Sequence, residues 1–378
     1  MTRKLVPSFI VTLTLALPAS AASNAIPLLY NDAGAASATN GASTLVAWTS
    51  MYSVYANTHA VYMRILDSPF DRNAIGVGRG HEPRVATNGR QYLIGYSYLL
   101  SRFNTSVSYD NALVQLVSPE GVKLGPPKTI NRSIFGGLSS VQWNGSHWVV
   151  AYQSGQPTIT HVAYLDESLN IVARLELGMG TLLALENLDG HWWAIYQNSL
   201  SVDAVELRAD GTAGARFSTG PLPVTAYNMH LTRGAAPLLL MQDGDDVDAM
   251  PFDPFAGFGE RRPFLQATQL IDVEPYETGS LVLVASSGSR YDTIFINAAG
   301  EIAPRLPLLE VPTQWASSTL GPSKNGLLLF TTPQITFPHA TGDLFAYRVP
   351  PARATIDPAS ARLVSQGSLP DRRRSVRH

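Results

Sequence analysis

The chain has 378 residues, of which 15% are charged, a formal net charge of −2 and no cysteine. Without cysteine, disulfides, thiolate metal ligands and cysteine nucleophiles are excluded. The charge balance argues against a nucleic-acid partner, which requires a basic face. The part between the two ends is more acidic still, because several basic residues lie in the ends themselves: Arg3, Lys4, Arg372, Arg373, Arg374 and Arg377.

The first 22 residues have the features of an export signal. Arg3 and Lys4 precede an apolar stretch over 5–17, and Ala19-Ser20-Ala21 provides a small-residue cleavage site. The stretch is too short to span a bilayer comfortably, and no later segment approaches 18 apolar residues. We therefore expect export to the periplasm or the medium, with no membrane span after cleavage near Ala22. An uncleaved membrane anchor is the alternative.

One sequence pattern recurs along the chain: a short turn that contains glycine precedes a run of apolar residues. Asn40-Gly41 precedes 44–48, Asn88-Gly89 precedes 92–96, and Asn144-Gly145 precedes 148–152. Seven such glycines lie 44 to 56 residues apart: Gly41, Gly89, Gly145, Gly190, Gly234, Gly279 and Gly326. A strand-rich unit that repeats with a period in the forties predicts a β-propeller.

Residues 84–130 indicate what one repeat contains. Strands are expected over 84–86, 91–97, 112–117 and 122–130, with a type I′ turn at Asn88-Gly89. Four antiparallel strands in a meander form a propeller blade. The sequence therefore predicts an all-β fold, a single domain of seven such blades over 23–365. Six or eight blades, or two smaller domains, are the alternatives.

The two ends of the chain are predicted to close the ring. Blade seven has clear strands over 317–321, 327–331 and 344–349, and its fourth strand is expected from 24–30, which would pair the N-terminal and C-terminal segments. Residues 354–364 are the alternative source of that strand. The basic tail over 366–378 is expected to be disordered, and the protein is expected to be a monomer.

Long connections between second and third strands predict the binding site. They occur at 49–58, 98–110 and 332–341, in blades one, two and seven, which are neighbours in a closed ring. Function tends to lie on such loops, and aromatic and polar groups on a concave rim suit a protein, peptide or glycan partner. The alternative is that these loops merely tolerate insertion. The candidate ligand-binding residues are Tyr52, Tyr55, His59, Arg79, His81, Tyr98, Arg102, Phe103, Trp315, Phe337 and His339.

Catalytic and metal-binding motifs are absent from the sequence, so we expect no metal and no cofactor. There is no Gly-x-Ser-x-Gly elbow and no zinc-type histidine spacing. The acidic run 243–248 lacks the EF-hand spacing and is interpreted as a solvated loop. Glycoside hydrolysis needs two facing carboxylates. The carboxylates in or before the expected innermost strands are Glu82, Glu186, Asp272, Glu274 and Glu310.

The phrase Asn-Gly-x-x-Tyr/Trp-Leu/Val-Val/Ile-x-Tyr resembles secreted bacterial β-propeller proteins of undefined function, over residues 24–350. The signature motifs of WD40, kelch and sialidase-like propellers are missing, so no family catalytic residue carries over. The sequence favours an exported, non-catalytic binding module that contacts its partner through the loops of blades seven, one and two. The alternatives are a glycan-processing enzyme with carboxylates in the central funnel, and a structural module of the cell envelope.

Overall fold

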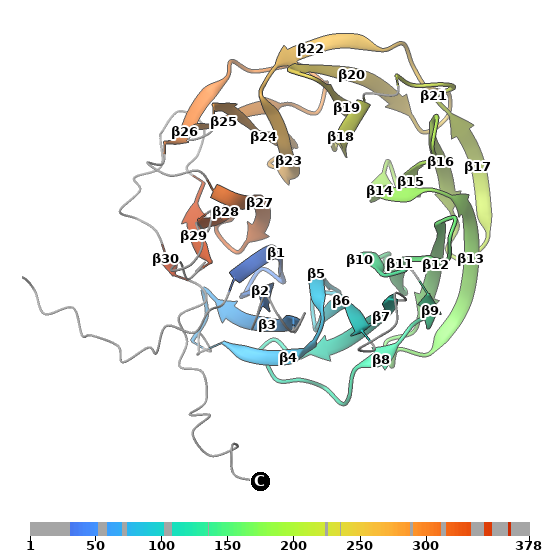
Figure 1. The fold of residues 1–378 in the computed structure, drawn as a ribbon, viewed down its shortest axis with the longest axis vertical. Helices are drawn as coiled ribbons and strands as arrows, with labels where there is room; N and C mark the ends of the chain where they lie inside the picture. The colour runs from blue at the N-terminus through green and yellow to red at the C-terminus, as the bar shows by residue number, and fades with distance from the viewer. Residues whose placement is uncertain are drawn as a thin grey trace, which may run out of the picture.

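The computed structural model describes residues 31–51, 59–69, 74–101, 108–134, 136–223, 226–234, 236–287, 290–310, 315–333, 344–349 and 362–363. These residues form seven antiparallel sheets arranged around a central axis (Figure 1). The all-β fold and the seven blades predicted from the repeat are therefore confirmed. None of the described segments is a helix long and apolar enough to cross a membrane.

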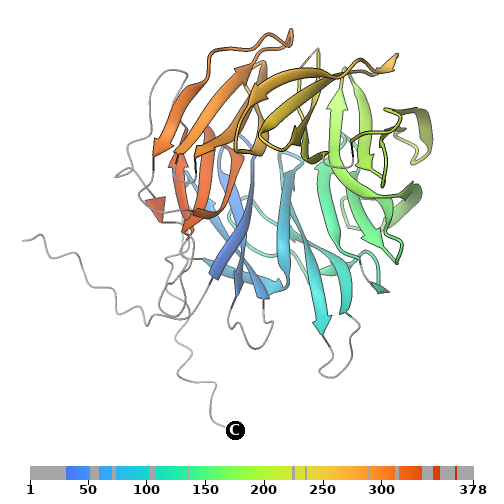
Figure 2. The same cartoon turned by 45° about the horizontal axis from the view of Figure 1, so that its top comes forward.

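Each blade begins at the axis and runs outwards in chain order, with its strands spanning the ring from one face to the other (Figures 1 and 2). Blade one contains β1 (Asn31–Thr39), β2 (Thr44–Met51), β3 (His59–Leu66) and β4 (Ile75–Arg79). Blade two contains β5 (His81–Thr87), β6 (Tyr92–Ser101), β7 (Ser108–Val117), β8 (Lys128–Thr129) and β9 (Ser133–Ile134), and both β8 and β9 pair with β7. Blade three contains β10 (Leu138–Trp143), β11 (Trp148–Ser154), β12 (Ile159–Leu165) and β13 (Ile171–Met179).

The remaining four blades follow the same order. Blade four contains β14 (Thr181–Leu188), β15 (His191–Gln197), β16 (Val202–Leu207) and β17 (Ala213–Ser218). Blade five contains β18 (Ala226–Leu231), β19 (Leu238–Asp243), β20 (Asp246–Asp253), β21 (Gly257–Phe258) and β22 (Arg262–Gln266), which pairs with β20. Blade six contains β23 (Gln269–Tyr276), β24 (Gly279–Ser287), β25 (Arg290–Ile296) and β26 (Leu306–Glu310). Blade seven contains β27 (Trp315–Ser323), β28 (Gly326–Pro333), β29 (Phe345–Arg348) and β30 (Arg362–Leu363).

The last strand of blade seven comes from the C-terminal segment, where Leu363 of β30 lies opposite Phe345 of β29. This is the source that the sequence left as the alternative, so the predicted pairing of the two chain ends is not confirmed. Residues 24–30, the export signal and the basic tail lie outside the described residues. Side chains join blade one to blade seven, since Ser37 Oγ donates a hydrogen bond to the Pro322 carbonyl at 2.8 Å.

The apolar runs of the second strands are continuous because both faces of each strand are buried between neighbouring blades. On β11, Trp148 and Val150 pack with Leu93 of blade two, whereas Val149 packs on the other side with Leu185 of blade four. Successive side chains of a strand point to opposite faces, so one strand supplies two interfaces. Each fully buried aliphatic side chain contributes about 1.5–3 kcal/mol.

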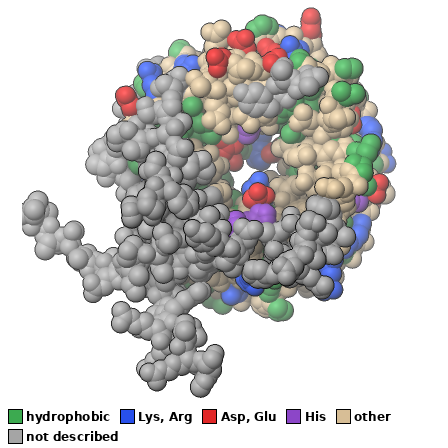
Figure 3. All heavy atoms as spheres, viewed as in Figure 1, with side chains coloured by type: hydrophobic (Ala, Val, Ile, Leu, Met, Phe, Trp, Pro, Cys, Tyr) green, Lys and Arg blue, Asp and Glu red, His purple; other side chains and the backbone are tan. Residues whose placement is uncertain are grey.

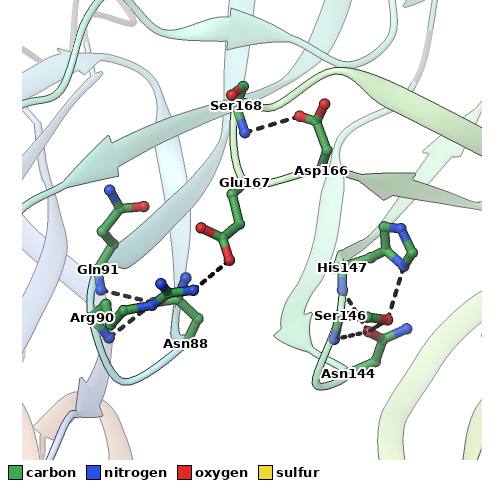
Figure 4. Close-up of polar contacts among 9 residues, drawn as sticks. All are labelled: Asn88, Arg90, Gln91, Asn144, Ser146, His147, Asp166, Glu167 and Ser168. Carbon is green, nitrogen blue, oxygen red and sulfur yellow. Dashed lines mark hydrogen bonds and ion pairs between the residues drawn. The ribbon is translucent and has the colours of Figure 1, made fainter.

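Asparagine side chains, rather than left-handed asparagine backbones, organise the first turns of blades two and three (Figure 4). Asn88 Oδ1 accepts hydrogen bonds from the amides of Arg90 and Gln91 at 3.0 and 2.8 Å. Gly89 has φ +85° but Asn88 has no positive φ, so the type I′ turn predicted there is wrong. The side-chain oxygen of the asparagine accepts hydrogen bonds from the turn's backbone amides, and this stabilises the turn without a positive φ at the asparagine. Both positions of a two-residue turn do have positive φ at Asp189 and Gly190.

Candidate functional site

The two faces of the ring differ in their connections. We call the face that carries the connections between second and third strands the loop face, and the opposite one the turn face. His, acidic and basic side chains gather around the central opening of the ring (Figure 3). The described residues place polar groups at both ends of this channel, one set at the boundary of blades one and two and another across blades four to seven.

Two predicted site residues meet at the loop face. His59 begins β3 and His81 begins β5, and their rings lie edge to face with centroids 5.7 Å apart. The Gly80 amide donates to the His59 carbonyl at 3.0 Å, which joins the starts of the two strands. Glu82 follows, with Oε1 3.9 Å from His81 Nδ1 and a side chain that is 66% exposed. The structure therefore assembles a His59–His81–Glu82 group from two blades, which we call the rim group.

The rim group holds a neutral base beside an ionised acid at neutral pH. Burial lowers the pKa of His59, and His81 lowers it further, although Glu82 opposes the shift. His81 lowers the pKa of Glu82. His59 Nδ1 is buried and has no hydrogen-bond partner among the described residues. A buried polar atom without a partner needs an explanation, such as a water molecule or a ligand.

The rim group also contains one of the six described non-glycine residues with positive φ. Glu82 has φ +51°, a backbone conformation that residues other than glycine, asparagine and aspartate rarely adopt. Its amide donates to Thr49 Oγ1 of β2 at 2.9 Å, so blade one helps to hold this conformation. A strained residue persists only where surrounding contacts hold it, and such residues are found preferentially at functional sites. Sequence reasoning missed Thr49, since a threonine near a strand end has no distinguishing pattern.

Three further predicted ligand-binding residues lie on described strands of blades one, two and seven. Arg79 is exposed at the end of β4, Tyr98 lies on β6 opposite Asn111, and Trp315 begins β27 opposite Pro333. Neither Arg79 nor Tyr98 forms a hydrogen bond, ion pair or ring contact with the rim group among the described residues. The remaining candidates lie outside the described residues: Tyr52, Tyr55, Arg102, Phe103, Phe337 and His339.

Three predicted funnel carboxylates lie on innermost strands of blades four and six. Arg233, in the connection after β18, contacts the carboxylate of Glu186 from β14. Burial raises the pKa of Glu274 on β23 well above its usual value, and Asp272 and Glu186 raise it further while Arg233 opposes them. Burial also raises the pKa of Glu186, against the effect of Arg233. An arginine thus lies among carboxylates from two blades, in a group that sequence spacing did not indicate.

Asp272 differs from Glu186 and Glu274 because its carboxylate accepts hydrogen bonds from the next blade. Its Oδ2 accepts from Thr319 Oγ1 at 2.6 Å and from the Leu320 amide at 2.8 Å, which ties blade six to blade seven. His230 Nδ1 lies 3.8 Å from its Oδ1. Glu310 precedes β27, the innermost strand of blade seven, as predicted, but it ends β26, the outermost strand of blade six, and so does not lie on a strand that lines the channel.

The comparisons with known proteins concern the fold. No protein-family model and no curated protein sequence matches the chain. The β-propeller domain of the Trilobed protease from Pyrococcus furiosus, described as having an open velcro topology, has a TM-score of 0.54 and 12% identity, covering 90% of this chain and 97% of that one. A putative 6-phosphogluconolactonase from Bacteroides uniformis has a TM-score of 0.53 and 12% identity, covering 80% and 92%.

The acylaminoacyl peptidase from Pyrococcus horikoshii has a TM-score of 0.53 and 10% identity, and the match covers 89% of this chain but 52% of that one. The chain therefore spans about half the length of that enzyme. At these identities the likeness shows architecture and not activity. This chain is a seven-bladed β-propeller, similar in fold to propellers from proteins with different printed activities.

Proposed function

We propose that this chain is an exported, non-catalytic binding propeller that holds a protein, peptide or glycan partner through the loops of blades seven, one and two. The observation that carries the proposal is the rim group at the loop face of blades one and two. It combines the buried Nδ1 of His59, which has no hydrogen-bond partner among the described residues, with the exposed, ionised carboxylate of Glu82. A polar partner would satisfy both groups at once.

The chemistry of the rim group favours a partner rich in hydroxyl or amide groups. A neutral imidazole offers one donor and one acceptor, and a carboxylate offers acceptors only. Peptides and glycans both present donors and acceptors at short spacing. The export part of the proposal is supported by residues 1–22, whose sequence resembles a cleaved signal.

The test is a binding screen of the mature chain on a peptide array and a glycan array, followed by titration of the best binder. Glu82→Gln removes the rim charge, and Arg90→Gln is the matched control because Arg90 lies in the β5–β6 turn at the opposite face. We expect Glu82→Gln to weaken binding about tenfold, the scale of one charged hydrogen bond. Unchanged binding in Glu82→Gln and in a variant with residues 52–58 shortened would reject this location.

A second candidate function has its own observation. Glu274 has a pKa raised well above its usual value, and Glu186 lies close enough to contribute to that shift. A carboxyl whose pKa is raised and that lies near a second carboxyl group is typical of glycan-processing sites. In that case Glu274→Gln abolishes turnover of an oligosaccharide panel, whereas Glu310→Gln on the outer strand retains it. Equal turnover by both variants would remove this candidate.

A further inference from the structure

Blades three to six share a residue pair that lies outside the glycine repeat. In each of these blades, a polar residue on the third strand stands thirteen positions before an arginine on or just before the strand that pairs outside it. The four pairs are His161 and Arg174, Asp203 and Arg216, Asp248 and Arg261, and Asp292 and Arg305. The constant spacing means that the four blades place this pair at corresponding positions.

In blades five and six the pair is an ion pair. Arg261 Nε lies 3.1 Å from Asp248 Oδ2, and Arg305 Nε lies 2.7 Å from Asp292 Oδ2.

In blade four the aspartate is present, but no ion pair joins Asp203 to Arg216 among the described residues, and Arg216 Nη2 donates to the Leu177 carbonyl at 2.7 Å. Blade three lacks the aspartate itself, because His161 stands where blades four to six have aspartate. The protein therefore supplies no carboxylate to Arg174 from the third strand.

The contacts of Arg174 are with neutral oxygens. Its Nη1 donates to the Tyr152 hydroxyl and its Nη2 to the Ile130 carbonyl, each at 2.7 Å. Its guanidinium carbon lies 5.9 Å from the centre of the Tyr152 ring. Within the described part of the chain, no acidic side chain forms an ion pair with Arg174. These bonds orient the guanidinium without neutralising its charge.

A pocket of about 500 Å³ lies beside this arginine, between the connection that leaves blade two and the face of blade three. Such a volume is within the range of small-molecule sites. Its lining includes Arg132, Ser154, His161 and Arg174. A pocket of about 590 Å³ occupies the corresponding place in blade five, but its lining is acidic, with Asp243, Asp246, Asp248 and Arg261.

The neutral groups of the blade-three pocket are also ordered. Ser154 Oγ and His161 Nε2 are hydrogen-bonded at 2.7 Å, and the His161 ring stacks on Tyr152 with centroids 5.1 Å apart. The two arginines are therefore accompanied by a hydroxyl and an imidazole in fixed positions. Arginine pairs with planar oxyanions through two parallel hydrogen bonds, and a carboxylate matches that geometry.

We propose that the blade-three pocket binds a small ligand through its carboxylate, which pairs with Arg174 and Arg132 as an aspartate side chain pairs with the equivalent arginine in blades five and six. Ser154 and His161 contact the remainder of the ligand. The proposal does not rest on the rim group, because it uses other residues in other blades. The carboxylate is preferred to phosphate because the corresponding positions of the repeat contain aspartate carboxylates.

The test uses acetate and D-glucuronate as carboxylate probes, with D-glucose as the neutral control and inorganic phosphate as the competing oxyanion. Binding is measured by calorimetry and by the NMR signals of the His161 ring. His161→Asp installs the residue of the other blades, and Arg132→Gln removes an exposed cation. We expect glucuronate to bind and glucose to fail, and each variant to weaken binding about tenfold.

Arg261→Gln in blade five is the matched control, and it should leave glucuronate binding unchanged. Thermal unfolding of each variant shows whether the ring is intact. Saturable glucuronate binding that His161→Asp weakens about tenfold supports the proposal. Tighter binding of phosphate than of glucuronate overturns the carboxylate assignment. Failure of both acetate and glucuronate to bind, or equal binding by His161→Asp, overturns the site.

Discussion

The guanidinium of Arg233 contacts the carboxylate of Glu186 across the boundary between blades four and five, near the turn face of the channel. The backbone of the same arginine is anchored in blade six, since its amide donates to Ser280 Oγ at 2.6 Å and its carbonyl accepts from that hydroxyl at 3.3 Å. Arg233 therefore connects three consecutive blades. A closed ring depends on such contacts, because each blade packs only on its neighbours.

Replacement of Glu186 by glutamine should weaken the ring, because it leaves the Arg233 charge without its partner. The side chains are 17% and 38% exposed respectively, so solvent screens part of the effect. We expect the free energy of unfolding to fall by about 1–3 kcal/mol, below the cost for a fully buried pair. Chemical denaturation measures this, and Glu260→Gln on an exposed segment is the control. Equal stability of the two variants would contradict the role of the pair.

The raised pKa of Glu274 predicts how stability varies with pH. Its folded pKa lies above the unfolded value near 4.5, so folding favours the protonated form. The stabilisation is complete below the unfolded pKa and is lost as the pH rises through the folded pKa. Asp272, Glu186 and Arg233 also act on this carboxyl, so its removal also removes its coupling to them.

Glu274→Gln keeps the shape and removes the titration. The variant should therefore lose less stability than the wild type as the pH rises from about 4 to about 8, and the difference between the two curves reports the titration of Glu274 together with its coupling to Asp272, Glu186 and Arg233. Melting temperatures measured across this range provide the comparison. A constant difference at every pH would show that Glu274 titrates with an ordinary pKa.

The blades were predictable because local and global requirements coincide in them. A turn, a buried strand and a second turn are adjacent in the sequence, and β11 carries one continuous apolar run because both its faces are covered. The closing strand was predicted from 24–30 and the C-terminal source was only the alternative, because β30 contains only Arg362 and Leu363 and so has no periodic pattern. Its place depends on the free edge of β29.

The sites were only partly predictable, for a related reason. His59 was found because it follows the long connection 49–58, and His81 because it lies at the neighbouring connection between blades one and two. Arg233 was missed, since its partner Glu186 lies in another blade and only ring closure brings them together. The third-strand pairs, such as Asp292 and Arg305, do have a sequence signal, which is their constant spacing of thirteen residues. The signal was missed because the repeat was recognised from its apolar residues and glycines, and these pairs are polar.

The positive φ of Glu82 predicts an unusual order of stability for two substitutions. Glycine adopts φ +51° without the steric cost that a Cβ atom brings, whereas alanine keeps that cost. After the greater entropy of an unfolded glycine is included, Glu82→Gly should be more stable than Glu82→Ala by about 0.5–1 kcal/mol. Thermal and chemical unfolding of both variants measure the difference. A more stable alanine variant would mean that residue 82 is not strained.

Protonation of His161 should strengthen carboxylate binding in the blade-three pocket. Burial lowers the pKa of His161 from 6.5, and Arg174 lowers it further while Glu176 raises it, so the imidazole is neutral at pH 7. Below its pKa it adds a positive charge beside Arg174 and Arg132. The affinity for glucuronate should therefore rise as the pH falls towards about 5, where a carboxylate is still ionised.

By linkage, bound glucuronate should raise the pKa of His161 by the same free energy that protonation adds to binding. NMR titration of the His161 ring with and without glucuronate measures this shift directly. His59, whose ring lies in the rim group of blades one and two, serves as the internal control and should keep its own titration curve. An affinity that is constant or falls as His161 becomes protonated would mean that this imidazole does not face the bound carboxylate.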